Sequence, residues 1–189
     1  MNPLIALTLS HAGHSVGWVG DLADPNNPRQ EAAGGDQRFP QGVAMTIRRF
    51  TEVEAYQHAD DGYYYRPLVA GKELFSYVAH VPAGGYMPPD AEEAELFELS
   101  LFMLEGNLDG ILDTDRIALA PGDALHIPRG MPFGVENRGS DTVSFVLSFA
   151  PPPPGVDLEK MKAQAIERGR NVIEAADVED VVGPVTFPR

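Results

Sequence analysis

The chain of 189 residues contains no cysteine, which excludes disulfide scaffolding, cysteine nucleophiles and Cys-ligated zinc. Basic residues are also scarce, because 14 Lys and Arg stand against 28 Asp and Glu and give a formal net charge of -14. An acidic chain repels nucleic-acid phosphates and anionic lipids, so neither nucleic acid nor a membrane is an expected partner. An apolar stretch at residues 3–10 has no basic residue before it and is too short to cross a bilayer. We therefore expect a cytoplasmic protein.

Glycine and proline, by contrast, are abundant: 19 Gly and 17 Pro are spread along the chain and divide it into short segments. Short apolar segments between turns are typical of an all-β fold. We predict strands at residues 4–10, 43–50, 74–81, 99–104, 123–127 and 142–149, and a long loop at residues 21–42. The prolines at 151–154 end the sheet region, and after an N-cap at Asp157 apolar residues recur at helical spacing as far as Gly169.

These signals divide the chain into three parts. Residues 1–42 form an N-terminal strand and arm, residues 43–150 a barrel, and residues 151–189 a proline linker with a C-terminal helix and tail. A folded chain of this length buries roughly 70% of its unfolded surface, so it needs neither a disulfide nor a structural metal to hold its core.

The most informative motif lies at residues 121–137, which read PGDALHIPRGMPFGVEN. A turn leads into a short strand, a second turn reverses the chain, and Phe133 opens the next strand. The segment resembles the second conserved motif of the cupin superfamily, G-x5-P-x-G-x2-H-x3-N, with Gly122, Pro128, Gly130 and Asn137 in register. Phe133 stands where the family has a metal-binding histidine.

Upstream, residues 82–106 read PAGGYMPPDAEEAELFELSLFMLEG and resemble the first cupin motif, G-x5-H-x-H-x3-4-E-x6-G, without any histidine. Two registers place the three ligand positions: counting back from Gly106 gives Glu92, Ala94 and Leu99, and counting forward from Gly85 gives Ala91, Glu93 and Glu98. A shift of one residue exchanges the faces of a strand. We favour the backward register, in which Leu99, Leu101 and Met103 face inward, because Gly106 lies nearer the strand and is better anchored. A β-bulge near Glu98 would restore the other register.

The resemblance covers roughly residues 83–137 and implies an RmlC-like jelly roll, that is, a double-stranded β-helix with a ligand pocket in its mouth. Cupins usually hold iron, manganese, nickel or zinc through three His and one Glu, serve as dioxygenases, isomerases, decarboxylases, lyases or binding and storage proteins, and often pair as homodimers. Neither motif here supplies an imidazole at a ligand position. We therefore expect no metal cofactor, a small-molecule ligand, and a homodimer to which the apolar strand at residues 4–9 contributes.

The expected pocket is apolar, with Phe133, Leu99, Leu101 and Met103 as its ligand-binding wall. His126, two residues before Pro128, is the candidate general acid or base because its pKa suits proton transfer, with Glu98 as a second catalytic candidate. His80, at the end of its strand, is a further ligand-binding candidate. A hydrogen-bonded wall residue is the simpler interpretation of each histidine.

Several functions remain open from sequence. The leading one is a metal-free binding protein or an isomerase, lyase or cyclase that transfers protons in an apolar pocket. The alternatives are a metal-dependent dioxygenase or lyase with ligands drawn from Glu93, Glu98, His80 and His126, and a barrel used only for dimerisation. The direction of His126 and Glu98 discriminates between them: both inward favours an enzyme, and both outward favours passive binding or structure. For the three tyrosines at residues 63–65 and for Arg66, an interface or structural salt bridge is favoured over a ligand contact.

Overall fold

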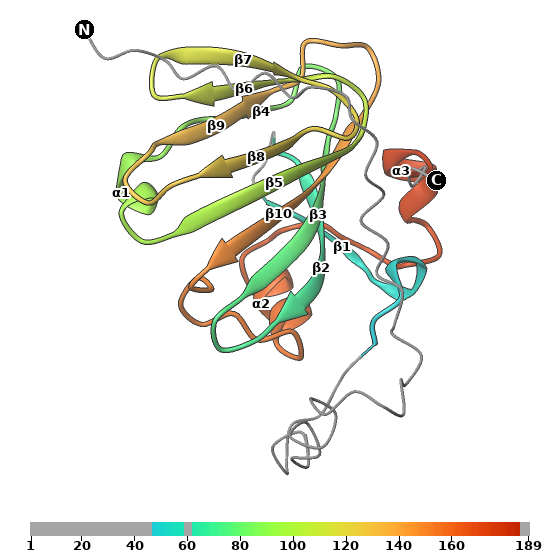
Figure 1. Cartoon of the computed structure of the whole chain (residues 1–189). Helices are drawn as coiled ribbons and strands as arrows, with labels where there is room; N and C mark the ends of the chain where they lie inside the picture. The colour runs from blue at the N-terminus through green and yellow to red at the C-terminus, as the bar shows by residue number, and fades with distance from the viewer. Residues whose placement is uncertain (1–46, 59–61, 186–189) are drawn as a thin grey trace, which may run out of the picture. The chain divides into compact units, whose positions relative to one another are not determined.

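The protein is an all-β jelly roll of two antiparallel sheets, seen in a computed structural model that describes residues 47–58 and 62–185 (Figure 1). The seven-stranded sheet has the order β11-β1-β2-β3-β10-β5-β8. Its strands are β1 (Ala55–Gln57), β2 (Tyr64–Ala70), β3 (Phe75–Val81), β5 (Glu98–Glu105), β8 (Ala124–Ile127), β10 (Val143–Ala150) and β11 (Val172–Ile173). The four-stranded sheet has the order β4-β9-β6-β7, with β4 (Tyr86–Met87), β6 (Leu108–Leu112), β7 (Asp115–Leu119) and β9 (Phe133–Glu136).

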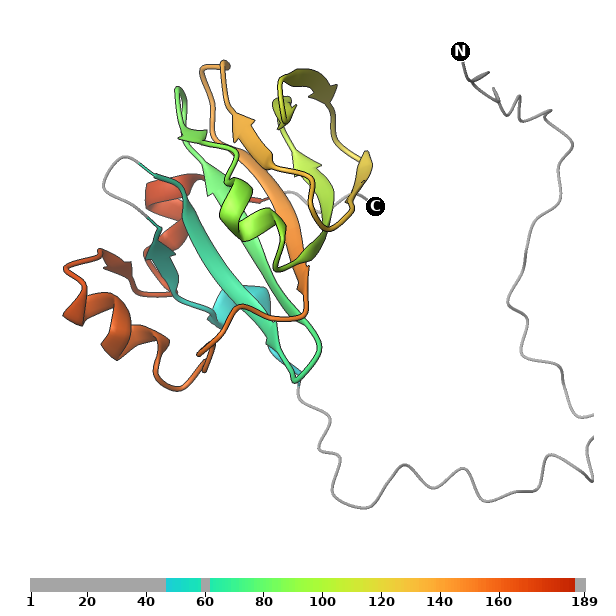
Figure 2. The same ribbon diagram turned by 90° about the vertical axis from the view of Figure 1, so that its left-hand side faces the viewer.

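Short helical elements accompany the sheets: η1 (Phe50–Glu52), α1 (Ala91–Ala94), α2 (Met161–Glu167) and α3 (Val178–Val182). Figure 2 shows α2 beside β1 and β11, so the C-terminal segment returns to the seven-stranded sheet. On the opposite face, Val178 and Val182 of α3 pack against Ala55 of β1. Within the described ranges, none of the helices is long and apolar enough to span a bilayer.

The predicted strands at residues 74–81, 99–104, 123–127 and 142–149 correspond to β3, β5, β8 and β10, and the predicted helix corresponds to α2. The strand expected at residues 4–10 and the loop at residues 21–42 lie outside the described residues. The strand expected at residues 43–50 is wrong where the structure describes it, because η1 forms there instead. The guanidinium of Arg66 donates to the carbonyls of Phe50 and Val53, at 2.6 and 2.9 Å, and so holds this segment against β2.

The core between the sheets contains the inward side chains of β5. Leu101 and Met103 are fully buried, and Leu99 is half-buried at the pocket end. Pairing of β5 with β10 is regular from Glu98 to Met103, and the register shifts only beyond that point, between Ser144 and Phe145 of β10. The structure therefore has the backward register, with no bulge at Glu98.

The fixed residues of the second motif build turns. Gly122 and Gly130 have φ values of 91° and 85°, in the left-handed region where a Cβ is unfavourable. Asn137 is fully buried, and its side-chain NH₂ group donates to the carbonyls of Val81, Pro82 and Asp141. The motif therefore specifies backbone geometry around β8 and β9.

Candidate functional site

A pocket of about 600 Å³ opens at the mouth of the barrel. Strands β1, β2, β3, β5, β9 and β10 supply its walls, while the proline segment after β10 and helix α2 supply one side of its rim. Its aromatic lining consists of Tyr63, Tyr65, Phe75, Tyr77, Tyr86, Phe97, Phe133 and Phe149, together with the imidazole of His58. Leu99, Leu147 and Met161 add aliphatic surface.

The rings of Tyr63, Tyr65, Phe75, Tyr77, Phe97 and Phe149 contact one another as a continuous layer. Tyr77 lies 5.2 Å from Tyr65 and 5.6 Å from both Phe75 and Phe149, measured between ring centroids. Phe97 meets Phe149 edge to face at 5.6 Å. Such pairs fix ring orientation and contribute roughly 0.5–1.5 kcal/mol each beyond burial of their area. The pocket therefore has preformed walls suited to a flat apolar ligand.

Polar groups also line the pocket, and one set lies near the ends of β1, β2 and β3. The hydroxyls of Tyr63 and Tyr77 are 2.9 Å apart and hydrogen-bonded. His58 stacks on Tyr63 with a centroid distance of 4.7 Å and an interplanar angle of 12°. Loss of water around the ring, and secondarily the positive charge of Arg170, lower the pKa of His58 below its usual value. The imidazole is therefore neutral at neutral pH and able to accept a proton.

The metal that the resemblance implies does not fit these residues. Phe133 holds the last ligand position, and Leu99 and Ala94, which take first-motif positions, line the same pocket with hydrocarbon. The other first-motif position, Glu92, is exposed on α1, a single helical turn before β5. Across residues 47–58 and 62–185 no cluster of three or more His, Cys, Asp or Glu side chains is placed to hold an ion.

Two of the predicted wall residues, Leu99 and Phe133, line the pocket. Leu101 and Met103 face the same interior but lie in the barrel core, outside the pocket lining. The inward register of these residues is thus observed, while the apolar wall extends over β2, β3 and β10 rather than further along β5. Contact of Leu99 and Phe133 with a ligand stays a prediction.

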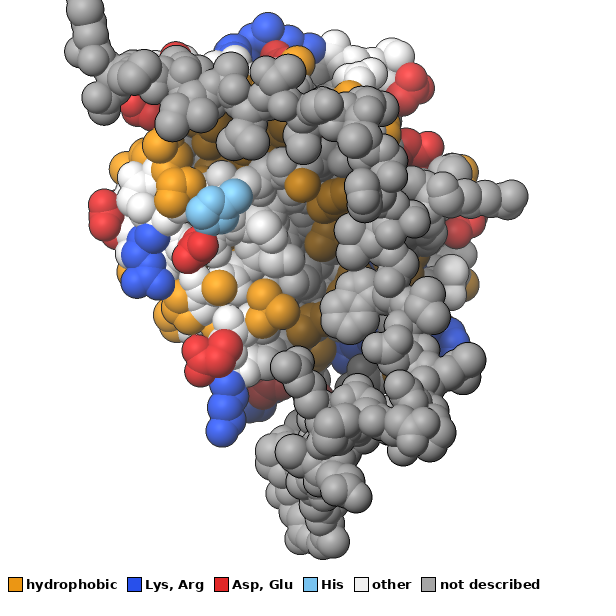
Figure 3. Space-filling model, in the orientation of Figure 1, with side chains coloured by type: hydrophobic (Ala, Val, Ile, Leu, Met, Phe, Trp, Pro, Cys, Tyr) orange, Lys and Arg blue, Asp and Glu red, His pale blue; other side chains and the backbone are white. Residues whose placement is uncertain are grey.

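The structure brings Glu98 and His126 together, but on the surface of the seven-stranded sheet. His126 Nε2 lies 2.7 Å from Glu98 Oε1, and the two side chains are 64% and 56% exposed. A histidine beside an acidic side chain is visible over β5 and β8 in Figure 3. Ser100 of β5 pairs with His126 of β8. The alternation that buries Leu101 and Ile127 turns the side chains of Glu98 and His126 outward. Neither lines the pocket, so the outward arrangement, which favours passive binding or structure, is the one observed.

His80 also lies away from the pocket, which corrects its expected place in the ligand wall. Tyr77 and Ala79 of β3 face the core, so His80 turns to the opposite face, where its Nδ1 lies 3.0 Å from Ser144 Oγ. Its Nε2 is buried without a hydrogen-bond partner. Burial, and secondarily the charge of Arg66, lower the pKa of His80 to about 3. His80 is therefore buried on the far face of β3, whereas His126 and Glu98 are exposed over β8 and β5, and the three do not assemble as a ligand set.

Sequence reasoning missed the polar side of the pocket. His58 lies at the end of β1, and Tyr63 and Tyr65 follow at β2, so the antiparallel β1–β2 pair places all three at the barrel mouth. The run of tyrosines was the available signal, but it was interpreted as an interface. Arg66, by contrast, is a buried structural residue, although its partners are carbonyls and the Phe50 ring at 3.9 Å rather than a carboxylate.

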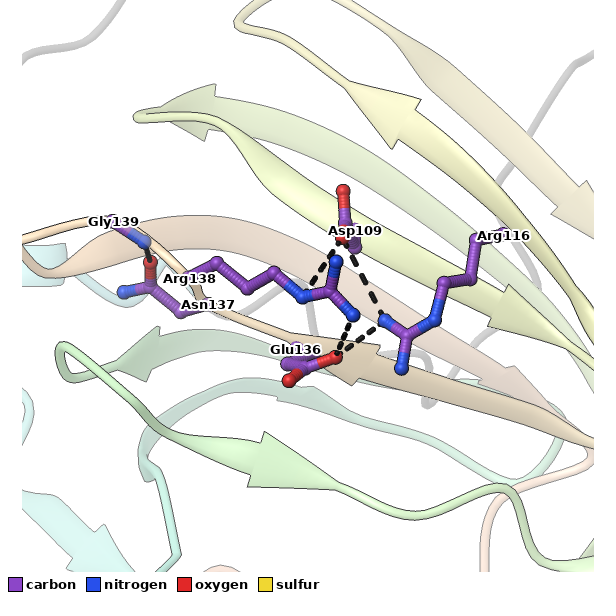
Figure 4. Close-up of polar contacts among 6 residues, drawn as sticks. All are labelled: Asp109, Arg116, Glu136, Asn137, Arg138 and Gly139. Atoms are coloured by element: carbon purple, nitrogen blue, oxygen red, sulfur yellow. Dashed lines mark hydrogen bonds and ion pairs between the residues drawn. The ribbon is translucent and has the colours of Figure 1, made fainter.

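A second polar cluster lies on the face of the four-stranded sheet that is turned away from the core (Figure 4). Arg138 contacts Asp109 at 3.4 Å and Glu136 at 3.1 Å, and Arg116 bridges the same two carboxylates. Hydrogen bonds from the two arginines lower the pKa of Glu136. Two guanidiniums thus balance two carboxylates, so the cluster joins β6, β7 and β9 and carries no surplus charge for a ligand.

Comparison with known proteins agrees with this architecture. Residues 77–149 match the family model described as Cupin domain. An RmlC-like cupin from Shewanella frigidimarina superposes with a TM-score of 0.52 at 15% identity, over 59% of this chain and 95% of that one. The double-stranded barrel is therefore a cupin domain.

Two further solved structures share the fold. The polyketide cyclase RemF from Streptomyces resistomycificus has a TM-score of 0.51 at 22% identity, over 61% of this chain and 85% of that one. KdgF from Halomonas sp. has a TM-score of 0.50 at 16% identity, over 59% and 97%. No curated protein matches the sequence. Likeness at this identity extends to the fold, and the activity has to be argued from the pocket.

Proposed function

We propose that this protein binds a flat, mainly apolar small molecule in the barrel pocket, and that it does so without a transition metal. The observation that carries this proposal is the aromatic lining, in which Phe133 takes the place of a metal-binding histidine. A pocket of about 600 Å³ lies inside the range of roughly 300–1,000 Å³ typical of small-molecule sites. Preformed aromatic walls favour a planar ligand because little side-chain freedom is lost on binding.

A neutral fluorescent probe tests this proposal. We expect N-phenyl-1-naphthylamine to bind the full-length protein at one saturable site, with the fluorescence increase that accompanies transfer into an apolar environment. Leu99→Gln places an amide in the apolar wall and is expected to weaken binding by about tenfold, since the lost apolar contact is worth about 1.4 kcal/mol.

Leu74→Gln is the matched control, because Leu74 is exposed and lies outside the pocket. It should bind the probe as the unmodified protein does, within about twofold. Circular dichroism establishes that both variants are folded. Absence of saturable binding, or equal affinity of the two folded variants, would contradict a ligand site in this pocket.

A second candidate, proton transfer as in isomerisation, elimination or cyclisation, is favoured by the neutral imidazole of His58 beside the hydrogen-bonded hydroxyls of Tyr63 and Tyr77. A general base of this kind contributes roughly 10²–10⁴-fold to a rate. An enolisable flat ketone, 2-tetralone, reports on it through deuterium exchange in D₂O followed by NMR. We expect the protein to accelerate exchange and His58→Gln to reduce the acceleration at least tenfold. Binding of the ketone without faster exchange would leave a binding protein only.

A further inference from the structure

The ionisable side chains at the pocket mouth have an uneven arrangement. Among the described lining residues they are Arg168 and Arg170 on the α2 side, the neutral His58, and Asp90. Oδ1 of Asp90 accepts the backbone N–H of Glu92 at 2.8 Å, so this carboxylate is engaged at the start of α1. Arg168, in contrast, has no side-chain hydrogen bond or ion pair with any residue that the structure describes.

The backbone holds the two arginines in place. Helix α2 ends in a turn in which Gly169 has a φ of 68°, its N–H donates to Ile166, and the N–H of Arg170 donates to the carbonyl of Ala165 at 2.9 Å. This six-to-one bond is the Schellman arrangement that closes many helices. The next residue, Asn171, accepts the backbone N–H of Gln57 at 3.0 Å and so attaches the turn to β1. The mouth therefore carries a cationic edge whose backbone is fixed by the turn.

The charges of this edge act on the aromatic side chains of the pocket that they line. Arg168 and Arg170 both oppose the rise that burial causes in the pKa of Tyr65, and Arg170 lowers the pKa of His58. Both guanidiniums are therefore close enough to stabilise negative charge at the mouth. This is unusual in a chain with a formal net charge of -14, whose overall field repels anions.

We propose that the ligand of this pocket is an aromatic carboxylate, with its ring system against the tyrosine and phenylalanine walls and its carboxylate at the Arg168 edge. The proposal rests on the binding function proposed above and names its ligand class. A guanidinium recognises a carboxylate through two parallel hydrogen bonds, which gives direction as well as attraction. The ligand thereby enters ring first, and its acidic group remains at the mouth.

A matched pair of probes isolates the charge. We would compare 2-naphthoate with the neutral 2-naphthamide by isothermal titration calorimetry of the full-length protein. We expect naphthoate to bind at least tenfold more tightly, and added salt to reduce this preference because the mouth is open to solvent. Replacement of both arginines, Arg168→Gln with Arg170→Gln, should bring the two affinities within about threefold by weakening naphthoate alone.

Arg129→Gln is the control, because it removes the same charge from an exposed position outside the pocket and should leave the preference intact. Equal binding of the two probes to the unmodified protein would overturn the carboxylate proposal and leave the apolar pocket standing. A preference that survives the double substitution would overturn the role of the arginines. Failure of both probes and of the neutral naphthylamine to bind would instead reject the pocket itself.

Discussion

Asn137 offers the most direct test of the idea that the surviving motif residues serve the fold. Its side-chain NH₂ group donates to the carbonyls of Val81, Pro82 and Asp141 at 2.9, 3.0 and 2.8 Å. Its Oδ1 accepts the backbone N–H of Gly139 at 2.9 Å (Figure 4). The side chain thus joins the end of β3 to the turn between β9 and β10. Asn137→Ala removes all of these bonds without placing a charge in the core.

The expected loss of stability follows from the hydrogen-bonding capacity of the amide. The NH₂ group has two protons for three carbonyls, so it contributes about two full bonds, and Oδ1 contributes about one more. At about 1 kcal/mol net for each bond, Asn137→Ala should lower the free energy of unfolding by about 3 kcal/mol. The residue is fully buried, so water replaces these bonds poorly in the folded state.

Urea unfolding followed by far-ultraviolet circular dichroism measures this change. Asn107→Ala, at an exposed asparagine, is the matched control and is expected to change stability by no more than about 0.5 kcal/mol. Under native conditions the folded Asn137→Ala protein should bind the neutral naphthylamine with unchanged affinity. A loss of less than about 1 kcal/mol in Asn137→Ala would refute the hydrogen-bond reasoning, since it would mean that the backbone carbonyls find equivalent partners.

Four further results are expected. The pKa of His80 is about 3 in the folded protein and about 6.5 in the unfolded chain, so only the unfolded chain takes up this proton as the pH falls below 6.5. Urea unfolding at pH 6.5 and at pH 5 should therefore show that the free energy of unfolding falls with pH. His80→Gln should remove up to about 1.4 kcal/mol per pH unit of that fall. Elemental analysis should find no stoichiometric transition metal, and chelator should move the melting temperature by less than about 2 °C, because no ligand linkage is lost. Light scattering at micromolar concentration should give a mass near twice 20.5 kDa, whereas a monomer would remove the dimer proposal. Glu98→Gln and His126→Gln should leave probe affinity unchanged within about twofold, since both side chains are outside the pocket; a tenfold loss would return them to the site.

The sequence was sufficient for the strands whose apolar residues lie between clear turns. β3 and β10 are buried along almost their whole length and are read directly as apolar runs. β2 was missed because Pro67 interrupts it, and proline argues against a central strand. The structure accommodates Pro67 with a shift in the pairing of β2 with β3 between Pro67 and Val69, so a local irregularity overrides the sequence rule.

The pocket was only partly predictable, because one side is formed by motif positions and the other by pairing between strands that are distant in the sequence. Phe133 and Leu99 were found through motif positions, since the motif fixes which residues of β5 and β9 face the interior. His58 and Tyr63 have no diagnostic spacing, and they reach the mouth only because β1 pairs with β2 and β11 returns to β1 from more than a hundred residues away. Pairing between such distant segments is not encoded in local periodicity.

The direction of His126 could have been settled from the strand itself. Ile127 is fully buried, and successive side chains of a strand point to opposite faces, so its neighbour His126 must face the other side of β8. The same period of two places Glu98 opposite Leu99 on β5. Motif resemblance drew attention to these polar residues because the family places chemistry nearby, whereas strand alternation assigns them to the outer surface.

The motif residues that form turns and the residues that line the pocket meet different requirements in this barrel. Gly122, Gly130 and Asn137 satisfy backbone requirements: two left-handed turn positions and one buried set of carbonyls. These requirements persist whatever the barrel binds. The ligand positions carry no such requirement, because Phe133 and Leu99 only have to fill the same space as the donors they replace. Phe133 and Leu99 offer hydrophobic contact at those positions, so on the proposed function the polar selectivity of the site would come from His58 and the arginine edge at the mouth.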